Sequence, residues 1–169
     1  MAALAAGAAL VCSSSLAPQG SVQAPSSPPG RIIRSWVAGC GTGDELWKYR
    51  DSTTVKCDEG GTALRGTEGA IEWPVDLTGT EIDRLVIEGN ELDRVRFELW
   101  WAAPEEPFRS ERSVPQFSTS TDSAEVIFEL AASSEWKGEL RRFRLAWSGT
   151  PSEDSRVTEV RVEKRGPPP

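Results

Sequence analysis

Apolar and polar residues alternate along three runs within residues 93–147. A period of two is the pattern of a β-strand with one face in the core and the other toward solvent. Polar segments rich in turn residues separate the runs, as loops between strands do. Three strands with one apolar face each need a second layer to cover them. The in-phase apolar positions are Val95, Phe97, Leu99, Trp101, Val126, Phe128, Leu130, Phe143, Leu145 and Trp147.

Shorter strand-like segments precede and follow these runs. The hairpin signal Asp58-Glu59-Gly60-Gly61 separates the first two. Pro74 is expected to end the third, because proline cannot donate to a strand ladder. We find no amphipathic helical pattern of ten or more residues. The sequence therefore predicts an all-β fold, a two-sheet antiparallel β-sandwich of the jelly-roll kind. The additional strands are predicted at residues 53–57, 62–67, 70–73, 81–88 and 156–164.

The distribution of charge divides the chain. None of the first thirty residues is charged, so all 19 basic and 26 acidic residues lie from Arg31 onward. A chain of 169 residues can build one domain with a substantial core. We predict a signal peptide at 1–17, a Pro/Ser-rich linker at 18–30, a single β-sandwich domain at 31–165 and a disordered tail at 166–169.

The small, apolar N-terminal segment predicts export, and hence a secreted or cell-envelope protein. Met1 is followed by alanines rather than a positive residue, so a disordered leader is the alternative interpretation. The apolar run is shorter than the roughly 20 residues that span a bilayer. Cys12 invites a lipoprotein interpretation, which would place a lipid anchor there. Val11 disfavours it, because a small residue is needed directly before an acylated cysteine.

Cys40 and Cys57 form the remaining cysteine pair. In an exported protein such a pair is most simply a disulfide. Its closed loop of about seventeen residues would contribute about 3 kcal/mol by restricting the unfolded chain. The chain contains no histidine, and two isolated cysteines do not make a zinc centre. No metal site or cofactor is predicted, and nothing in the sequence supports a structural calcium.

The order of motifs from residue 62 to residue 164 resembles a known family. It reads FELWW, then EEPFRSERSVPQF, EVIFEL, SEWKGELRRFRLAW and VTEVRVEK. This order is similar to that of the galactose-binding-like or carbohydrate-binding-module-like jelly-roll domains of exported bacterial proteins. The resemblance implies the same fold and a glycan-binding role. Family members often have an Asp-Pro pair where this chain continues with Leu145 to Ser148, so no binding residue is carried over.

The seven tryptophans are many for this length, and an exposed indole can stack on the apolar face of a sugar. Trp101 and Trp147 are in phase with apolar neighbours and are predicted to lie in the core. Trp100 falls on the opposite strand face. Trp136 lies in a loop and either contacts ligand or anchors that loop to the core. The candidate ligand-binding residues are Trp100, Trp136, Phe108, Arg94 and Arg96.

Arginines are frequent in two of the alternating runs. If those strands are neighbours, the arginines would form a cationic stripe suited to an anionic glycan. The alternative is a face of cross-strand ion pairs with Glu98 and Glu129. A net charge of −7 disfavours nucleic acid as a partner. The arginines of the stripe are Arg94, Arg96, Arg141, Arg142 and Arg144.

Catalysis has few candidate groups in this chain. There is no histidine to act as a base and no G-x-S-x-G motif. A glycosidase-type carboxylate pair would have to come from Glu98, Glu105, Glu106, Glu111 and Glu135, for which a solvated face is the alternative interpretation. We predict a non-catalytic module that binds carbohydrate or cell-envelope glycan. The alternatives are a structural or protein-interaction domain at the envelope, with an envelope protein as partner, and a small glycan-active enzyme. No membrane span is predicted beyond the signal or anchor.

Overall fold

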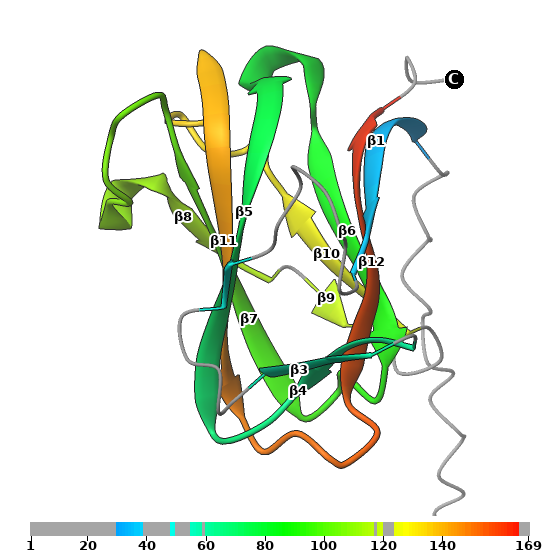
Figure 1. The fold of residues 1–169 in the computed structure, drawn as a ribbon. Coiled ribbons are helices and arrows are strands. Elements are labelled where there is room, and N and C mark those ends of the chain that lie inside the picture. The colour runs from blue at the N-terminus through cyan, green and yellow to red at the C-terminus, as the bar shows by residue number, and fades with distance from the viewer. Residues whose placement is uncertain are drawn as a thin grey trace, which may run out of the picture.

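Two antiparallel sheets pack face to face in a computed structural model of the chain (Figure 1). One sheet has seven strands in the order β3-β4-β12-β6-β10-β9, with β1 also beside β12. The other has five strands in the order β2-β5-β11-β7-β8. The fold is therefore the predicted all-β sandwich. The structure describes residues 30–38, 48–49, 55–58, 60–116, 118–119 and 124–165.

Twelve strands and two short 3₁₀ turns make up the described part of the chain. The seven-stranded sheet contains β1 (Arg31–Val37), β3 (Val55–Asp58), β4 (Gly61–Leu64), β6 (Arg84–Asn90), β9 (Ser118–Thr119), β10 (Glu125–Glu129) and β12 (Arg156–Lys164). The five-stranded sheet contains β2 (Lys48–Tyr49), β5 (Glu68–Thr78), β7 (Val95–Ala102), β8 (Ser113–Pro115) and β11 (Glu139–Gly149). The 3₁₀ turns are η1 (Gly79–Glu81) and η2 (Ser110–Arg112).

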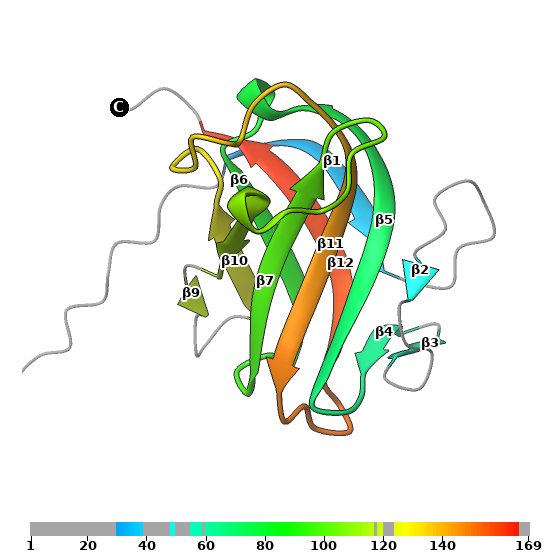
Figure 2. The same cartoon turned by 90° about the vertical axis from the view of Figure 1, so that its left-hand side faces the viewer.

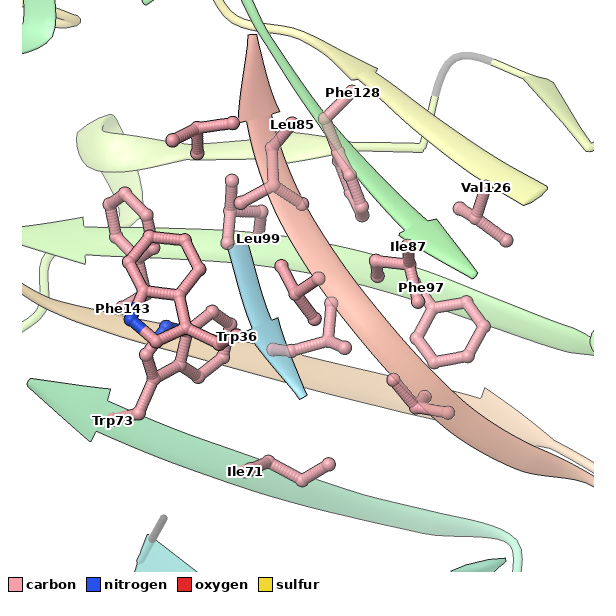
Figure 3. Packing of buried hydrophobic residues seen from close by; sticks show 14 of the residues in the cluster. Trp36, Ile71, Trp73, Leu85, Ile87, Phe97, Leu99, Val126, Phe128 and Phe143 are labelled. Atoms are coloured by element: carbon pink, nitrogen blue, oxygen red, sulfur yellow. The ribbon is translucent and has the colours of Figure 1, made fainter. Parts of the chain in front are cut away.

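The three alternating runs form β7, β10 and β11, which confirms them as strands. They do not form one sheet. β7 pairs with β11 in the five-stranded sheet, whereas β10 pairs with β6 in the other. Their apolar residues consequently meet from opposite sides of the core, where Leu99 of β7 and Phe128 of β10 are both fully buried (Figure 3).

Pro74 does not end a strand, contrary to the sequence prediction. β5 continues through it to Thr78. Pro74 lies opposite Arg142 of β11, beside a register shift between Leu140 and Arg142. A bulge of this kind interrupts the regular ladder, so a residue without an N–H is tolerated there. The strand predicted to begin at Glu81 instead begins at Arg84, because η1 occupies residues 79–81.

Aromatic side chains join β1 to the five-stranded sheet. Trp36 of β1 packs edge to face against Trp73 of β5 and Phe143 of β11, with both ring centroids 6.2 Å away. The Trp73 and Phe143 centroids are 5.6 Å apart. Figure 3 shows these three rings together at one end of the core. Edge-to-face pairs add to the burial of the large rings, so this cluster attaches β1 firmly to the core.

Several N-terminal predictions lie outside the described residues and stay predictions. They concern the signal peptide, most of the linker, Cys12 and Cys40. The tail at 166–169 also lies outside them. Cys57 is half-buried on β3, and the Cys40–Cys57 pairing stays a prediction. In the part of the chain that the structure describes, no helix has the length and apolar character of a membrane span.

Candidate binding face

The outer face of the five-stranded sheet combines aromatic and charged side chains. Four residues lie opposite one another across its strands: Glu72 of β5, Arg144 of β11, Trp100 of β7 and Ser113 of β8. Directly opposed residues of antiparallel strands project to the same side of a sheet. Their neighbours along the strands point into the core, so this row lies on the outside. Figure 2 is turned so that β7, β11 and β5 are in front.

Arg144 and Glu72 form the charged centre of this row. The Nε and Nη2 atoms of Arg144 both donate to Oε1 of Glu72, each at 2.7 Å. The two side chains keep only 17% and 19% of their surface exposed. Partial burial shields this pair from solvent and salt more than a surface ion pair. The pair therefore holds the guanidinium group in one orientation beside Trp100.

The segment between β7 and β8 folds back over this outer face (Figure 2). It carries Phe108, whose ring centroid lies 4.1 Å from Cζ of Arg144 and 5.0 Å from Cζ of Arg142. Both distances are within the range of a cation–π interaction. Phe108 is half-buried as a result. The name Trp100 face is used below for Glu72, Trp100, Phe108, Arg142 and Arg144.

A tight turn and two arginines hold this segment in place. In residues 103–106 the N–H of Glu106 donates to the carbonyl of Ala103 at 3.3 Å. Pro104 and Glu105 occupy the central positions, and Glu105 has a φ of 58°. Proline followed by a positive φ is the arrangement of a type II turn. The carbonyl of Glu106 accepts a hydrogen bond from Arg142, and its carboxylate accepts one from Arg112 at 2.7 Å.

Trp100 has a polar atom that its surroundings do not satisfy. The residue is half-buried, but its Nε1 is completely buried and has no hydrogen-bond partner in the part of the chain that the structure describes. Next to it on the same face, Glu98 accepts a hydrogen bond from the hydroxyl of Ser113 at 2.7 Å. A buried N–H without an acceptor costs about 1–3 kcal/mol. The core residues Trp36 and Trp147 also have a buried Nε1 without a partner among the described residues, so this feature is not specific to the Trp100 face.

The outer face of the seven-stranded sheet is built differently. Glu163 of β12 accepts hydrogen bonds from Nε of Arg84 and Nε of Arg161, both at 2.6 Å. Arg161 also pairs with Glu125 at 2.6 Å and with Glu88. The Arg84 and Glu163 side chains are only 7% and 2% exposed. We call these five residues the Glu163 face.

Opposing influences act on the pKa of Glu163. Burial is the largest and raises the pKa, because it penalises the charged carboxylate. Hydrogen bonds and charges from Arg161 and Arg84 together outweigh burial, so the pKa lies below its ordinary value of 4.5. Glu163 is thus held ionised between two arginines as part of a structural ion network.

Comparisons of the chain with protein-family models, with curated proteins and with solved structures return no match. The candidate site therefore rests on the geometry of this chain. Within the described residues, no group of three or more His, Cys, Asp or Glu side chains could hold a metal ion.

The structure brings together only two of the five predicted ligand-binding residues, Trp100 and Phe108. Arg96 is exposed on the same strand face, but it lies opposite Ser148, four residues or about 13 Å along β7 from Trp100. Arg94 is exposed in the turn before β7, farther still from Trp100. Neither arginine belongs to the Trp100 face.

Trp136 lies in the core rather than on a binding surface. It is 6% exposed, its Nε1 donates to the carbonyl of Ile82 at 3.0 Å, and its ring packs edge to face on Trp101 at 5.0 Å. Its placement matches the alternative in which it anchors its loop. Trp101 and Trp147 are buried, which confirms them as core residues.

The arginines do not line up as a stripe, although β7 and β11 are neighbours. In the register between them, Arg144 lies opposite Trp100 and Arg142 opposite Ala102. The expected acidic partners were also wrong: Glu98 binds Ser113, and Glu129 pairs with Arg165. The sequence analysis missed Glu72 as the partner of Arg144. Its outward position between Ile71 and Trp73 was the available signal.

Proposed function

We propose that this chain is an exported, non-catalytic binding module of the galactose-binding-like, jelly-roll kind, and that it binds glycan on the Trp100 face. The observation that carries the proposal is the placement of Trp100 and Phe108 beside an oriented Arg144–Glu72 pair on one sheet face. The apolar N-terminal segment supports export to the cell envelope or beyond.

The chemistry of the Trp100 face suits a sugar. Aromatic rings present flat apolar surfaces on which the C–H face of a pyranose can stack. The carboxylate of Glu72 can accept a hydrogen bond from a sugar hydroxyl. The charge of Arg144 is already compensated by Glu72. These features favour a neutral glycan over an anionic one.

Calorimetric titration with a panel of neutral and acidic glycans, with and without calcium, tests this function. We expect at least one neutral glycan to bind, and Trp100→Ala to weaken that binding at least tenfold. The matched control is Ser148→Ala, an exposed position of β11 opposite Arg96 rather than Trp100. Absence of binding by the folded domain, or equal affinities of Trp100→Ala and wild type, would refute the proposal.

Tryptophan fluorescence adds a second measurement. Five of the other tryptophans are buried in the core, so a ligand-induced change should originate mainly from Trp100. We expect Trp100→Phe to lose most of that change while retaining part of the affinity, because a phenyl ring can still stack but offers a smaller apolar surface than an indole. A full fluorescence change in Trp100→Phe would place the ligand elsewhere.

A structural or protein-interaction domain is the second candidate, and one observation favours it. β1 carries two exposed apolar side chains, Ile32 and Val37. An open strand with exposed apolar residues is suited to pairing with another strand. A small glycan-active enzyme has less support, because Glu98 and Glu106 are already bound to Ser113 and Arg112.

A further inference from the structure

β1 is an edge strand with an unusual surface. Among the described residues it pairs on one side only, with β12. Ile32 is 56% exposed and Val37 is 78% exposed, and they are the exposed large hydrophobic residues of the described chain. An edge strand offers a row of backbone N–H and C=O groups that another strand can bind. Apolar side chains beside such a row add to the binding.

A bulge places both exposed residues on the same face. Ile32 lies opposite Glu163, Ser35 opposite Arg161 and Val37 opposite Glu159, all on the outer face of the sheet. Without the register shift between Ile32 and Arg34, side chains five residues apart would point to opposite faces. The shift therefore brings Ile32 and Val37 to equal distances on either side of Ser35.

The backbone direction at this edge follows from one hydrogen bond. The N–H of Ala38 donates to the carbonyl of Thr158 in β12. Because successive residues of an antiparallel strand alternate in direction, the N–H and C=O groups of Ser35 and Val37 point away from β12. Across a two-fold axis, the backbone N–H of Ser35 in each copy can therefore donate to the backbone carbonyl of Ser35 in the other.

We infer that β1 pairs with β1 of a second copy of this chain, antiparallel and centred on Ser35. In this register Ile32 lies beside Val37 of the second copy, and Val37 beside Ile32 of the second copy. Arg34 lies opposite Trp36 rather than opposite the other Arg34, which avoids facing like charges. The pattern of exposed residues in β1 is thus complementary to itself, which favours a second copy over an unrelated strand.

Two-fold pairing joins the seven-stranded sheets of two molecules into one continuous sheet. Such an interface uses the same patch on both copies, so association stops at the dimer. The contact involves a single seven-residue strand from each copy. This is small beside the interfaces of stable dimers, so a weak, concentration-dependent dimer is expected. The inference is independent of the proposed glycan binding, because β1 lies in the other sheet.

Sedimentation velocity of the 169-residue chain over a range of about 10 to 500 μM tests the inference. We expect the mass to rise from 18.4 kDa toward twice that value. Val37→Lys should weaken the dimer at least tenfold, because each dimer loses two apolar contacts and gains two charges. The control Ser148→Lys changes an exposed position of β11 and should dimerise as wild type does.

A cysteine at the axis tests the register itself. Opposed residues of a hydrogen-bonded antiparallel pair have Cα atoms about 5.5 Å apart, within disulfide range. Ser35→Cys should form a disulfide-linked dimer under mild oxidation, beyond any dimer formed by wild type or Ser148→Cys. A monomer at all concentrations would overturn the inference, as would a dimer unaffected by Val37→Lys. Val37→Lys should keep its glycan affinity, so failure of the dimer and failure of glycan binding are distinguishable.

Discussion

The two outer faces of the sandwich use arginines for different purposes. On the Glu163 face, Glu163 lies between Arg84 and Arg161, so opposite charges satisfy one another within the sheet. On the Trp100 face, Arg144 binds Glu72 on one side and lies against Phe108, while the N–H of Trp100 has no acceptor in the described chain. Mutual compensation of charge gives the Glu163 face a structural role, whereas the aromatic rings beside the Arg144–Glu72 pair make the Trp100 face the candidate surface for a ligand.

Removing Glu163 should have the largest effect on stability. Glu163→Ala leaves Arg84 without its carboxylate in a nearly buried position, and we expect a loss of about 2–3 kcal/mol in the free energy of unfolding. Urea denaturation measures this loss. Glu139→Ala is the control, because its pair with Arg141 is exposed and should contribute less than about 1 kcal/mol. Equal losses in the two variants would contradict a special role for the Glu163 face.

The lowered pKa of Glu163 also predicts a pH dependence. The unfolded chain binds a proton near the ordinary value of 4.5, and the folded chain binds it only at lower pH. The stabilisation by Glu163 is therefore present above pH 4.5 and is lost as the pH falls through the lowered pKa. Unfolding measured from pH 7 to 3 should show a shallower acid loss in Glu163→Gln than in wild type. Parallel curves would refute this assignment.

Removing Arg144 should cost less stability than removing Glu163. Arg144→Ala loses a partly exposed ion pair with Glu72 and the stacking on Phe108, for which we expect about 1–2 kcal/mol. Arg141→Ala on the same strand is the control, because its partners Asp76 and Glu139 are exposed. If Arg144→Ala costs more than Glu163→Ala, the contrast between the two faces is wrong.

Glycine at position 105 should stabilise the turn before Phe108. Glu105 adopts a positive φ that side chains disfavour, so Glu105→Gly should raise the free energy of unfolding by about 0.5–1 kcal/mol. Glu153→Gly, in another exposed turn but without a positive φ, should lower it slightly. A loss of stability in Glu105→Gly would mean that the Glu105 side chain contributes more than its strain costs.

The smallest effect is expected at Trp100. Trp100→Phe removes a buried donor that has no partner but also removes apolar surface, so the free energy of unfolding should change by less than about 1 kcal/mol. Thermal unfolding measures the change. A large loss would show that Trp100 belongs to the structure in the way that Glu163 does, and would remove the distinction between the faces.

Much of the sandwich could be predicted because alternation records which face of a strand is buried. Phe97, Phe128 and Phe143 were assigned to the core in this way, and all three are buried. The pattern does not record which strand lies beside which. It therefore could not show that Arg144 lies opposite Trp100, or that Glu72 is its partner.

The misplaced site residues follow from the same limit. Trp136 carries no periodic signal in its loop, so only the position of Trp101 and Ile82 in space shows that it is buried. Arg96 shares its strand face with Trp100, but shared direction does not mean proximity when four residues separate them. Pro74 was misread because the bulge beside it arises from the way β5 pairs with β11, which the sequence of β5 alone does not show.

The position of β12 in the seven-stranded sheet affects the order in which the sheet can form. β12 is the last strand of the described chain to be synthesised, yet it lies between β6 on one side and β4 and β1 on the other. The seven-stranded sheet cannot be completed before residues 156–164 are available, because β12 fills the space between β6 and the two strands β1 and β4. Completion of the seven-stranded sheet therefore depends on pairing between segments far apart in the sequence, which is expected to slow folding.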